Sequence, residues 1–512
     1  MARLWWDVVM LVPIALLEEA LASVAALTAE LAAMRVERAE MQAKLDAMTA
    51  KLDAVLAKKR KKAAPAQPPE PAPPPSSLDA RPQPPAKPET DTEDRARKPR
   101  TKLPKPVLPT TEETVRPDVC AHCGGSRLQQ KDSSETELID YVSGYVRRRK
   151  IRRIRCRCAD CAKVTAPEVP SACLPKTHFS AAFVAWVVYQ KYALHLPLER
   201  IRGDLGRQGY PMSSSSISDL TQRALDELAG VADALHREAL SGSYLHSDAT
   251  GLPVVRPDLD HTHLGQMFFF GWGKLAVFRY APDKKAETFQ ALLGDFQGTL
   301  VLDASSTHNL ALEDGSIRWA GCNAHGLRKF REAVASDPVL GAEGERWIAS
   351  WFDQERVARE RGLVGPELLA WRQEHIGPLA SGFLRWLALV HPTVLPRSPL
   401  AEATRYYANY WRPLTAFLRD ANLPLENNFA ERNLRAQAVG RANWLFAGSD
   451  EAATNTAVAY TLVQTTKLHG LDSLAYLTWV LGRAARCRDG GGLYRGLTPA
   501  MYQEAQQRER GG

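Results

Sequence analysis

Three acidic residues, Asp248, Asp303 and Glu431, have the types and settings that support phosphodiester chemistry. Asp248 and Asp303 each end a short strand-like segment, residues 244–248 and 299–303. Glu431 lies in a polar stretch rich in Asn and Arg. Three such carboxylates, if the fold brings them together, can hold two divalent cations, one activating the attacking oxygen and one stabilising the leaving oxygen. A lone Asp at a strand end is more often a turn or cap residue, so the argument depends on the joint pattern.

The residues around Glu431 suit contact with DNA phosphates. On a helix, Glu431 and Arg435 share a face, and Asn428 and Arg432 lie on the adjacent flanks. We expect Arg432 and Arg435 to hold phosphates near the scissile bond, and we include Asn428 and Arg441 in the same DNA-contacting group. An intrahelical Glu–Arg pair is the alternative.

Three further residues near these acids allow two interpretations. His325 could orient a phosphate or a water, or it could be structural. We expect Trp444 and Phe446 to belong to the core rather than to stack on bases.

The predicted elements explain how the two aspartates could meet. In chain order we predict strands at 244–255, 266–270 and 275–280, a helix at 285–296, strands at 298–303 and 317–322, and a helix at 327–335. This is the order of a ribonuclease H-like domain, in which the first and fourth strands lie side by side. That pairing would place Asp248 and Asp303 within metal-sharing distance.

Five of the eight cysteines crowd into two clusters, which suits a metal site in a reducing compartment better than a disulfide framework. Cys120 and Cys123 form one C-x-x-C pair, and Cys158 and Cys161 form another, with 34 residues between the two pairs. Four thiolates so spaced predict structural zinc. Cys156 could replace Cys158 as a ligand. The basic segment between the pairs, 145–155, reads as a strand that could contact phosphates.

The N-terminal residues 1–118 differ from the rest of the chain in their sequence pattern and composition. Apolar residues recur at alternating steps of three and four from Leu17 to Val55, with only Arg38 interrupting, which predicts a self-associating coiled coil. A single amphipathic helix is the alternative. Residues 63–118 hold 16 of the chain's 34 prolines and cannot bury enough apolar surface to order themselves.

These observations predict a multidomain α+β chain. The expected parts are a coiled coil with a basic end at 14–62, a disordered Pro-rich linker at 63–118, a zinc-binding domain at 119–172, a helical, helix-turn-helix-like DNA-binding region at 175–241, the first part of a ribonuclease H-like catalytic domain at 242–335, a helical insertion at 336–420, the Glu-bearing helix of the catalytic domain at 421–450, and a helical C-terminal region at 451–512. Trp347, Trp351, Trp371 and Trp386 are expected to pack the core of the insertion.

Charge and hydropathy set the broad class. A net charge of +8 and a pI near 9.0 favour polyanion binding, although a merely basic protein would look the same. The apolar stretch at 4–17 is shorter than the about 20 residues that a membrane span needs. We expect a cytoplasmic protein with no membrane partner.

The chain resembles transposases of the insertion-sequence 66 family, within the DDE superfamily. The resemblance covers most of the sequence after residue 117, and its most specific part is the segment 427–449. The other segments that carry it are Lys191-Tyr192 with Leu196-Pro197-Leu198, Asp248-Ala-Thr, Gly298-Thr-Leu-Val-Leu-Asp303, Cys322-Asn-Ala-His325 with Arg328-Lys329-Phe330, and Thr466-Lys467-Leu468-His469-Gly470 with Tyr476-Leu477.

The resemblance implies that Asp248, Asp303 and Glu431 are a catalytic triad that uses two Mg²⁺ ions (or Mn²⁺). It implies DNA partners, namely the element's terminal inverted repeats and target DNA, and accessory proteins of the same element. The family usually has a lysine where Ala442 stands, and a Gly-Tyr pair where Ala304-Ser305 stand. Two other functions remain: a ribonuclease H-like nuclease without strand transfer, and a DNA-binding repressor with an idle triad.

Overall fold

Residues 108–512 are described by a computed structural model, apart from 143, 168–171, 257, 259–260, 304–316, 485–492 and 512. The coiled coil predicted at 14–62 and most of the predicted linker lie outside the described residues. All described residues belong to one unit that begins at Pro99. Among them, no helix is both long enough and apolar enough to cross a membrane.

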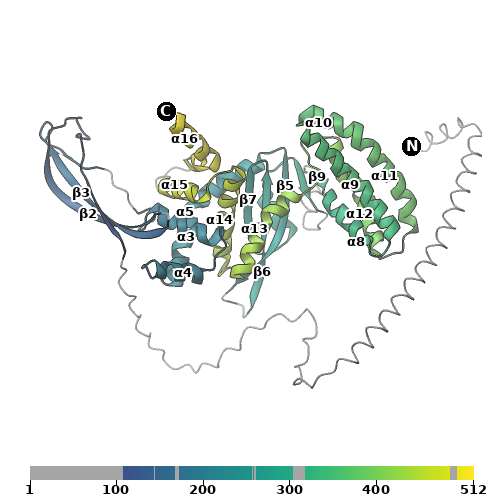
Figure 1. Ribbon diagram of the computed structural model, residues 1–512, viewed down its shortest axis with the longest axis horizontal. Coiled ribbons are helices and arrows are strands. Elements are labelled where there is room, and N and C mark those ends of the chain that lie inside the picture. Colours follow the sequence, from purple (N-terminus) through teal and green to yellow (C-terminus); the bar gives the residue numbers. More distant parts are fainter. Residues whose placement is uncertain are drawn as a thin grey trace, which may run out of the picture. The chain divides into compact units, whose positions relative to one another are not determined.

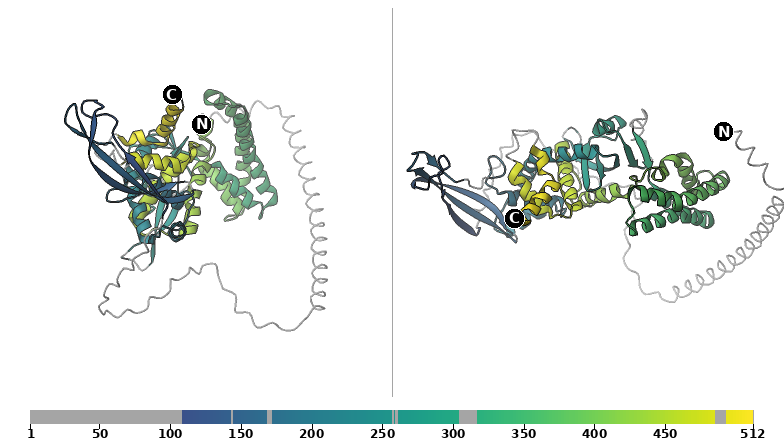
Figure 2. Two further views of the ribbon diagram at one scale, coloured as in Figure 1. Left: turned by 60° about the vertical axis from the view of Figure 1, so that its left-hand side comes forward. Right: turned by 90° about the horizontal axis from the view of Figure 1, so that it is seen from above.

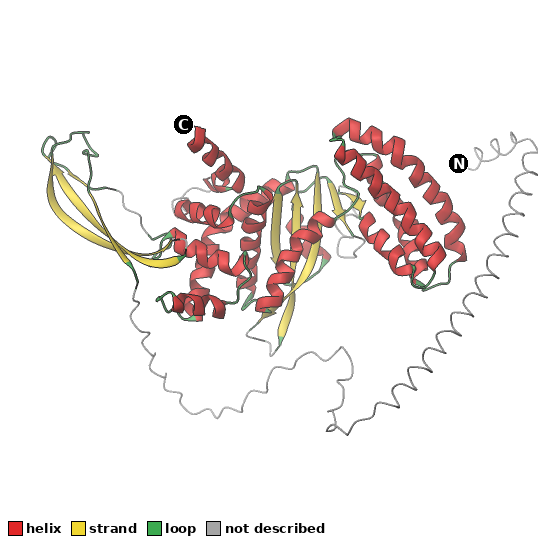
Figure 3. Ribbon diagram, in the orientation of Figure 1, coloured by secondary structure: helices red, strands yellow, loops and turns green. Residues whose placement is uncertain are grey.

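A five-stranded mixed sheet occupies the middle of the described chain (Figures 1 and 3). Its order is β7-β6-β5-β8-β9, with β5, β6 and β7 antiparallel and β5, β8 and β9 parallel. The strands are β5 (Tyr244–Val255), β6 (Thr262–Trp272), β7 (Leu275–Ala281), β8 (Thr299–Leu302) and β9 (Arg318–Gly321). The expected pairing of β5 with β8 is therefore confirmed. Every residue of β8 is buried, as an apolar run in the interior of a sheet requires.

Short connections shape this sheet. Gly273 has φ +57° in the β6–β7 turn, a conformation that side chains with a Cβ rarely adopt. Helix α6 (Ala286–Leu293) connects β7 to β8, and α8 (Asn323–Ala333) follows β9 directly. The predicted helix at 327 thus begins four residues early, so that His325 lies in its first turn.

The free edge of β7 is covered by α14 (Asp450–Leu468). The Phe278 N–H donates to Thr461 Oγ1 at 2.9 Å, and the Ala276 N–H donates to Thr465 Oγ1 at 3.2 Å. Both hydroxyls also donate to carbonyls of the same strand residues. Side chains of a helix thus complete the hydrogen bonding of an edge strand that would otherwise invite pairing with another chain.

Three helices precede the sheet: α3 (Ala181–Tyr192), α4 (Leu198–Arg207) and α5 (Ser214–Leu240). Ser180 caps α3 by accepting from the Phe183 N–H, and Ser213 caps α5 by accepting from the Ser216 N–H. The helix order expected for 175–241 is present, and α3 and α5 pack against α14 and α15 (Ser473–Ala484). The chain ends in η5 (Leu493–Leu497) and α16 (Pro499–Gly511).

A helical bundle follows α8, shown in green in Figure 2. It contains α9 (Pro338–Glu360), α10 (Gly365–Trp371), η2 (Arg372–Ile376), α11 (Gly377–Val390), η3 (His391–Thr393), α12 (Pro399–Leu414) and η4 (Ala416–Leu418). Trp351 is fully buried in its core, and Trp347 and Trp386 pack against that core. Trp371 does not join it. Its ring stacks on His375 with centroids 3.6 Å apart and donates to the Gln354 carbonyl.

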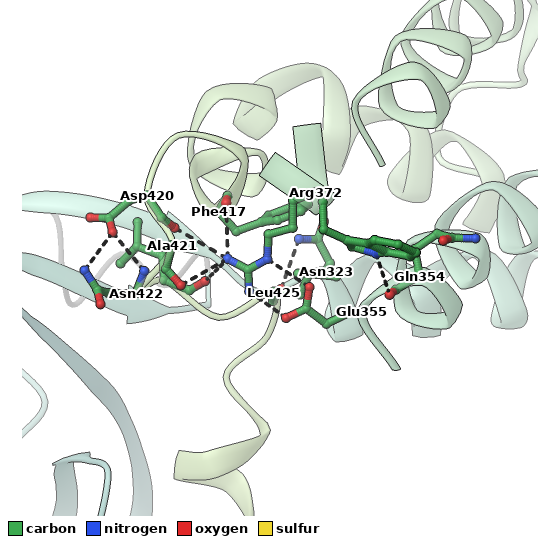
Figure 4. A network of polar contacts seen from close by, with 11 residues as sticks. Asn323, Gln354, Glu355, Arg372, Phe417, Asp420, Ala421, Asn422 and Leu425 are labelled. Atoms are coloured by element: carbon green, nitrogen blue, oxygen red, sulfur yellow. Dashed lines mark hydrogen bonds and ion pairs between the residues drawn. The ribbon is translucent and has the colours of Figure 1, made fainter. Parts of the chain in front are cut away.

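Arg372 fastens this bundle to the segment that leads back to the sheet (Figure 4). Its side chain is 2% exposed and forms a bidentate ion pair with Glu355, with Nη2–Oε1 at 2.5 Å and Nε–Oε2 at 2.9 Å. The remaining nitrogen, Nη1, donates to the carbonyls of Phe417, Ala421 and Leu423. A buried guanidinium satisfied in this way is strongly directional, so it fixes the path of residues 417–423.

A separate four-stranded sheet precedes α3. It is a long hairpin of β2 (Leu128–Val142) and β3 (Tyr145–Cys158), with β1 (Thr110–Val115) parallel to β3 and β4 (Val164–Thr165) antiparallel to it. The expectation that residues 63–118 form a linker throughout is wrong for 110–115. This Thr-rich segment forms β1, with Glu112 and Glu113 placed against Lys150 and Arg149.

The α14 hydroxyls generate a stability prediction. Thr461→Val should lower the free energy of unfolding by about 1–3 kcal/mol, because the buried Phe278 N–H then lacks an acceptor. The matched control is Thr454→Val in the same helix, whose exposed hydroxyl bonds only the Asp450 carbonyl. Equal losses in urea unfolding of both variants would contradict the proposed role of α14.

Candidate active site

The β5–β8 pairing places the two aspartates side by side. The register pairs His246 with Val301, and Asp248 and Asp303 each lie two residues beyond that pair. Equal offsets along parallel strands keep residues alongside one another. Asp248 is paired on its other side with Phe269 of β6, so it lies on the central strand of the sheet.

Glu431 is brought to the same place by α13 (Asn428–Trp444), which packs on β5 and β6. Both ends of this helix are tied to β5. At its start, Asn427 Nδ2 donates to the Ser247 carbonyl at 2.7 Å. Beyond its end, the Ala447 N–H donates to the Pro253 carbonyl, and the Ala447 carbonyl accepts from the Val255 N–H. The helix therefore runs along β5, with Glu431 in its first turn close to Asp248.

Asn427 is the residue on which this arrangement depends. It is 2% exposed, and both its side chain and its backbone form hydrogen bonds. Besides its bond to Ser247, its Oδ1 accepts from His246 Nδ1 at 2.8 Å, and its backbone N–H donates to Cys322 Sγ at 3.2 Å. It thus joins the central strand to the end of β9. The sequence signal is its position directly before a helix, where Asn commonly caps, but here the side chain bonds β5 instead of capping α13.

The Glu431 carboxylate faces two bases on α8. Arg328 Nη2 lies 3.5 Å from Oε2, and His325 Nδ1 lies 3.7 Å from Oε1. Neither Oε1 nor His325 Nδ1 has a hydrogen-bond partner among the described residues, although both atoms are buried. A buried acceptor without a partner is costly, which makes it a natural place for a ligand.

The electrostatics of the aspartates differ from those of exposed acids. Burial, together with the charges of Asp303 and Glu431, raises the pKa of Asp248 to about 6, although the hydrogen bond from the Ala249 N–H acts in the opposite direction. Burial lowers the pKa of His246 to about 4, so this ring is neutral and donates through Nδ1 to Asn427. The site therefore has an excess of negative charge that a cation would relieve.

The three carboxylates are neighbours, but their oxygens are too far apart for all three to bind one metal ion as the side chains stand. Among the described residues, the four cysteines form a group with all ligand atoms within 4.8 Å of one another, and the three acids do not. Like charges repel, and Glu431 is drawn toward Arg328. Residues 304–316, directly after Asp303, are outside the described part.

The predicted DNA-contacting residues have two kinds of surroundings. Arg432 and Arg435 are exposed on α13, and Arg432 lines a hollow of about 340 Å³ with Glu426 and helix α9. Asn428 donates to Glu426, and Arg441 donates to the Gly251 carbonyl of β5. Arg441 therefore supports the helix in this structure.

The two aromatic residues at the end of α13, Trp444 and Phe446, have different surroundings. Trp444 is half-buried against the core, as expected, but Phe446 is 46% exposed, so its predicted place in the core is wrong. The preceding residue, Leu445, has φ +68° and is also exposed. Residues 445–446 face solvent, while the next residue, Ala447, forms backbone hydrogen bonds with Pro253 and Val255 of β5.

The four cysteines of the two C-x-x-C pairs come together. Cys120 Sγ lies 3.4 Å from Cys161 Sγ, and Cys123 Sγ lies 3.6 Å from Cys158 Sγ. The group contains Cys158 and not Cys156, which resolves the alternative left open by the spacing. Four thiolates at this separation could hold a tetrahedral zinc ion.

The basic strand β3 is largely neutralised by its neighbours. Its cations form ion pairs with carboxylates on β1 and β2. The pairs are Arg147–Asp140, Arg148–Glu137, Arg149–Glu113, Lys150–Glu112, Arg152–Glu135 and Arg155–Asp132. Exposed pairs of this kind are weak and can exchange, but the strand has less spare positive charge than its sequence indicated.

Comparison with known proteins supports the resemblance found in the motifs. The sequence model of the IS66 transposase family matches residues 176–455, more than half of the chain, from before α3 into α14. The chain belongs to the IS66 transposase family. Membership indicates a nucleic-acid-processing enzyme with DNA as its partner, and the matched span contains Asp248, Asp303 and Glu431.

This IS66 family chain also matches proteins of Sinorhizobium fredii (strain NBRC 101917 / NGR234) along most of their length. It is 29% identical over 395 residues to the uncharacterized protein y4hP, covering 72% of this chain and 71% of that protein. It is 28% identical over 402 residues to the uncharacterized protein y4jD, covering 74% and 78%. The similarity thus extends well beyond the short motifs around Asp248, Asp303 and Glu431.

The cysteine cluster generates a metal prediction. Cys158→Ser should lower the zinc content of the purified protein and the melting temperature of the β2–β3 region, because one of four ligands is lost. Cys156→Ser is the matched control, two residues away on the same strand, and should keep its zinc. Equal zinc loss in both variants, measured by atomic absorption, would contradict the assignment of Cys158.

The raised pKa of Asp248 generates a pH prediction. Between pH 3.8 and about 6 the folded state binds more protons at Asp248 than the unfolded state, so without divalent cations stability should fall as pH rises through this window. In Asp248→Asn the melting temperature should fall less between pH 3.8 and about 6 than in the wild type. Asp295→Asn, at an exposed position, should keep the wild-type dependence on pH. An unchanged slope in Asp248→Asn would contradict the assigned environment.

Proposed function

We propose that this IS66 family member is a DDE transposase with a ribonuclease H-like catalytic domain. Asp248, Asp303 and Glu431 are its catalytic triad, and its substrates are the terminal inverted repeats of an insertion sequence and target DNA. The observation that carries the proposal is that three carboxylates are neighbours: Asp248 on β5, Asp303 directly after the paired parallel strand β8, and Glu431 on a helix tied along β5.

The residues present fit two Mg²⁺ ions, or Mn²⁺. Hard divalent cations prefer carboxylate oxygens and complete their coordination with water and substrate phosphate. Glu431 Oε1 is buried and has no hydrogen-bond partner among the described residues, and Asp248 has a pKa raised to about 6 by burial and neighbouring acids. Both observations support a cation at this position.

Bound there, the ions would supply charge stabilisation at the attacking and leaving oxygens. The protein's part is positioning. Asn427 fixes the start of α13 against Ser247, so that Glu431 stays in register with Asp248. Arg328 holds the Glu431 carboxylate from the other side, and the exposed Arg432 and Arg435 are in place to bind phosphates that flank the scissile bond.

Two in-line displacements use the same site. In the first, a water oxygen attacks the phosphorus at the element's end, the P–O3′ bond breaks, and the 3′ oxygen leaves and takes up a proton. In the second, that 3′-hydroxyl attacks a phosphorus of target DNA and releases a target 3′-hydroxyl. The bonds made and broken are the same in kind, so one triad serves both steps.

The proposed function also gives roles to the parts of the chain outside the triad. The Cys120, Cys123, Cys158 and Cys161 group holds structural zinc, and helices α3 to α5 recognise the terminal repeats. The segment 14–62 pairs two protomers through a coiled coil, so that two element ends meet in one complex with accessory proteins of the element. The protein acts in the bacterial cytoplasm, on the nucleoid.

End cleavage and strand transfer on an oligonucleotide with the element's terminal repeat, in Mg²⁺, test the proposal. Glu431→Gln should lower both rates by roughly 10³-fold, since a lost metal ligand costs several kcal/mol. DNA binding should remain. Glu451→Gln, on the exposed start of α14, is the matched control and should keep activity.

The outcomes separate the three functions. Joined product from the wild type and none from Glu431→Gln supports a transposase. Cleavage without joining would indicate a nuclease. Tight, specific binding without any reaction, even with the element's accessory proteins added, would indicate a repressor and contradict the proposal.

A further inference from the structure

A cavity of about 340 Å³ lies beside the triad, between α9, α13 and residues 424–426. Two of its lining residues relate it to the acids. His246 is two residues before Asp248 on β5, and Arg432 directly follows Glu431 on α13. Because a strand rises about 3.3 Å per residue, His246 is roughly 7 Å from Asp248 along β5. The cavity is therefore a neighbour of the proposed catalytic site.

Part of the cavity wall is apolar and aromatic. It consists of Phe352 of α9, Phe429 of α13, Pro424 and Leu425. The Phe429 ring packs on the His246 ring, with centroids 5.2 Å apart. The ring of Phe352 contacts no other aromatic ring of the described chain, so it is free to stack on a ligand. Nucleobases stack on aromatic side chains of this kind, whatever their sequence.

The wall also contains three exposed arginines, Arg356 and Arg359 of α9 and Arg432 of α13. Arg356 forms ion pairs with Asp353 and Glu360 of its own helix. Arg359 and Arg432, in contrast, have no carboxylate within 4.0 Å among the residues that the structure describes. Two guanidinium groups from different helices are thus available to a ligand at one cavity.

The two carboxylates of the cavity wall are already engaged. Glu355 is held by the bidentate ion pair with Arg372, and Glu426 accepts a hydrogen bond from Asn428. Burial raises the pKa of Glu426, and the charges of the nearby arginines act against that shift. The charge left over at the cavity is therefore positive, which suits a phosphate group.

A nucleotide offers both a flat base and a phosphate. We propose that this space, which we name the α9–α13 cavity, holds one unstacked nucleotide of the DNA substrate, with its base against Phe352 and its phosphate at Arg359 and Arg432. The inference rests on the proposed function, which makes DNA the ligand. A base reaches such a cavity only after it leaves the duplex, which costs pairing and stacking energy. Holding that nucleotide would fix the position of the neighbouring phosphates relative to the triad.

The position of the cavity determines which nucleotide is held. The roughly 7 Å between His246 and Asp248 corresponds to about two nucleotides at about 3.4 Å each. The extruded nucleotide is therefore expected within about two positions of the scissile bond.

The test compares terminal-repeat duplexes that carry one mismatched base pair, moved one position at a time past the scissile bond. At the extruded position, the full-length wild type should bind the mismatched duplex about tenfold more tightly than the paired duplex, because a mismatch lowers the cost of extrusion. A mismatch about ten nucleotides away should give no gain, because that base stays in the stack.

Two variants and a control assign the gain to the cavity. Phe352→Leu keeps an apolar side chain against the bundle core but removes the ring, and Arg359→Gln removes an exposed charge. Each should reduce the gain to about twofold or less. Arg346→Gln changes an exposed arginine of α9 that does not line the cavity, and it should keep the full gain. A residue with a merely structural role would change the affinity for both duplexes equally and leave their ratio unchanged.

Free deoxythymidine monophosphate distinguishes a nucleotide of DNA from a free one. Competition by this compound together with the mismatch gain supports the proposal, because the free nucleotide then occupies the same cavity. Binding of the free nucleotide that Arg359→Gln abolishes, without any mismatch gain, would indicate a site for free nucleotides and overturn the inference.

The failures are distinguishable. If the wild type binds and cleaves the paired duplex but no mismatch near the scissile bond improves binding, the inference is wrong and the proposed function stands. If the wild type binds neither paired nor mismatched DNA, both are wrong.

Discussion

The geometry of the candidate site depends on one buried amide, that of Asn427. The Asn427 side chain forms hydrogen bonds with His246 and with the Ser247 carbonyl of the central strand. Its backbone N–H donates to the sulfur of Cys322, directly after β9. Because water does not reach this amide, each bond lost would leave a buried polar group unpaired. The start of α13 therefore has one register against β5, and Glu431 follows one turn later.

The same constraint explains how a long interruption is tolerated. Between Asp303 and Glu431 lie 127 residues, yet the cost of closing a loop grows only slowly with its length. The bundle has its own core around Trp351, and Arg372 fixes the segment that leaves it. Asn323, at the start of α8, then holds the returning chain in place. Its Nδ2 and its backbone N–H both donate to the Leu425 carbonyl. The chain thus reaches Asn427 along a fixed path.

Much of the sheet could be predicted from the sequence, and the polar contacts could not. Strand β5 has the predicted bounds, and its pairing with β8 follows from the order of elements. The strand at 110–115 contains no proline but lies within the proline-rich range 63–118, so composition alone predicts a linker there. The outward turn at Phe446 was missed because it depends on Ala447 pairing with β5, a contact between residues about 190 positions apart. Local patterns carry no record of such contacts, nor of the carboxylates that neutralise β3.

Charge is distributed in two different ways in the described part of this protein. On β3, cations and carboxylates are paired within the sheet. At the triad, three acids lie near one another, and Glu431 Oε1 has no hydrogen-bond partner among the described residues. The most direct test of the central claim is anomalous diffraction from crystals of the full chain with Mn²⁺. The account predicts anomalous density bounded by Asp248, Asp303 and Glu431, and its loss in Asp248→Asn. Crystals that cleave bound DNA in Mn²⁺ but show no manganese at these carboxylates would contradict it.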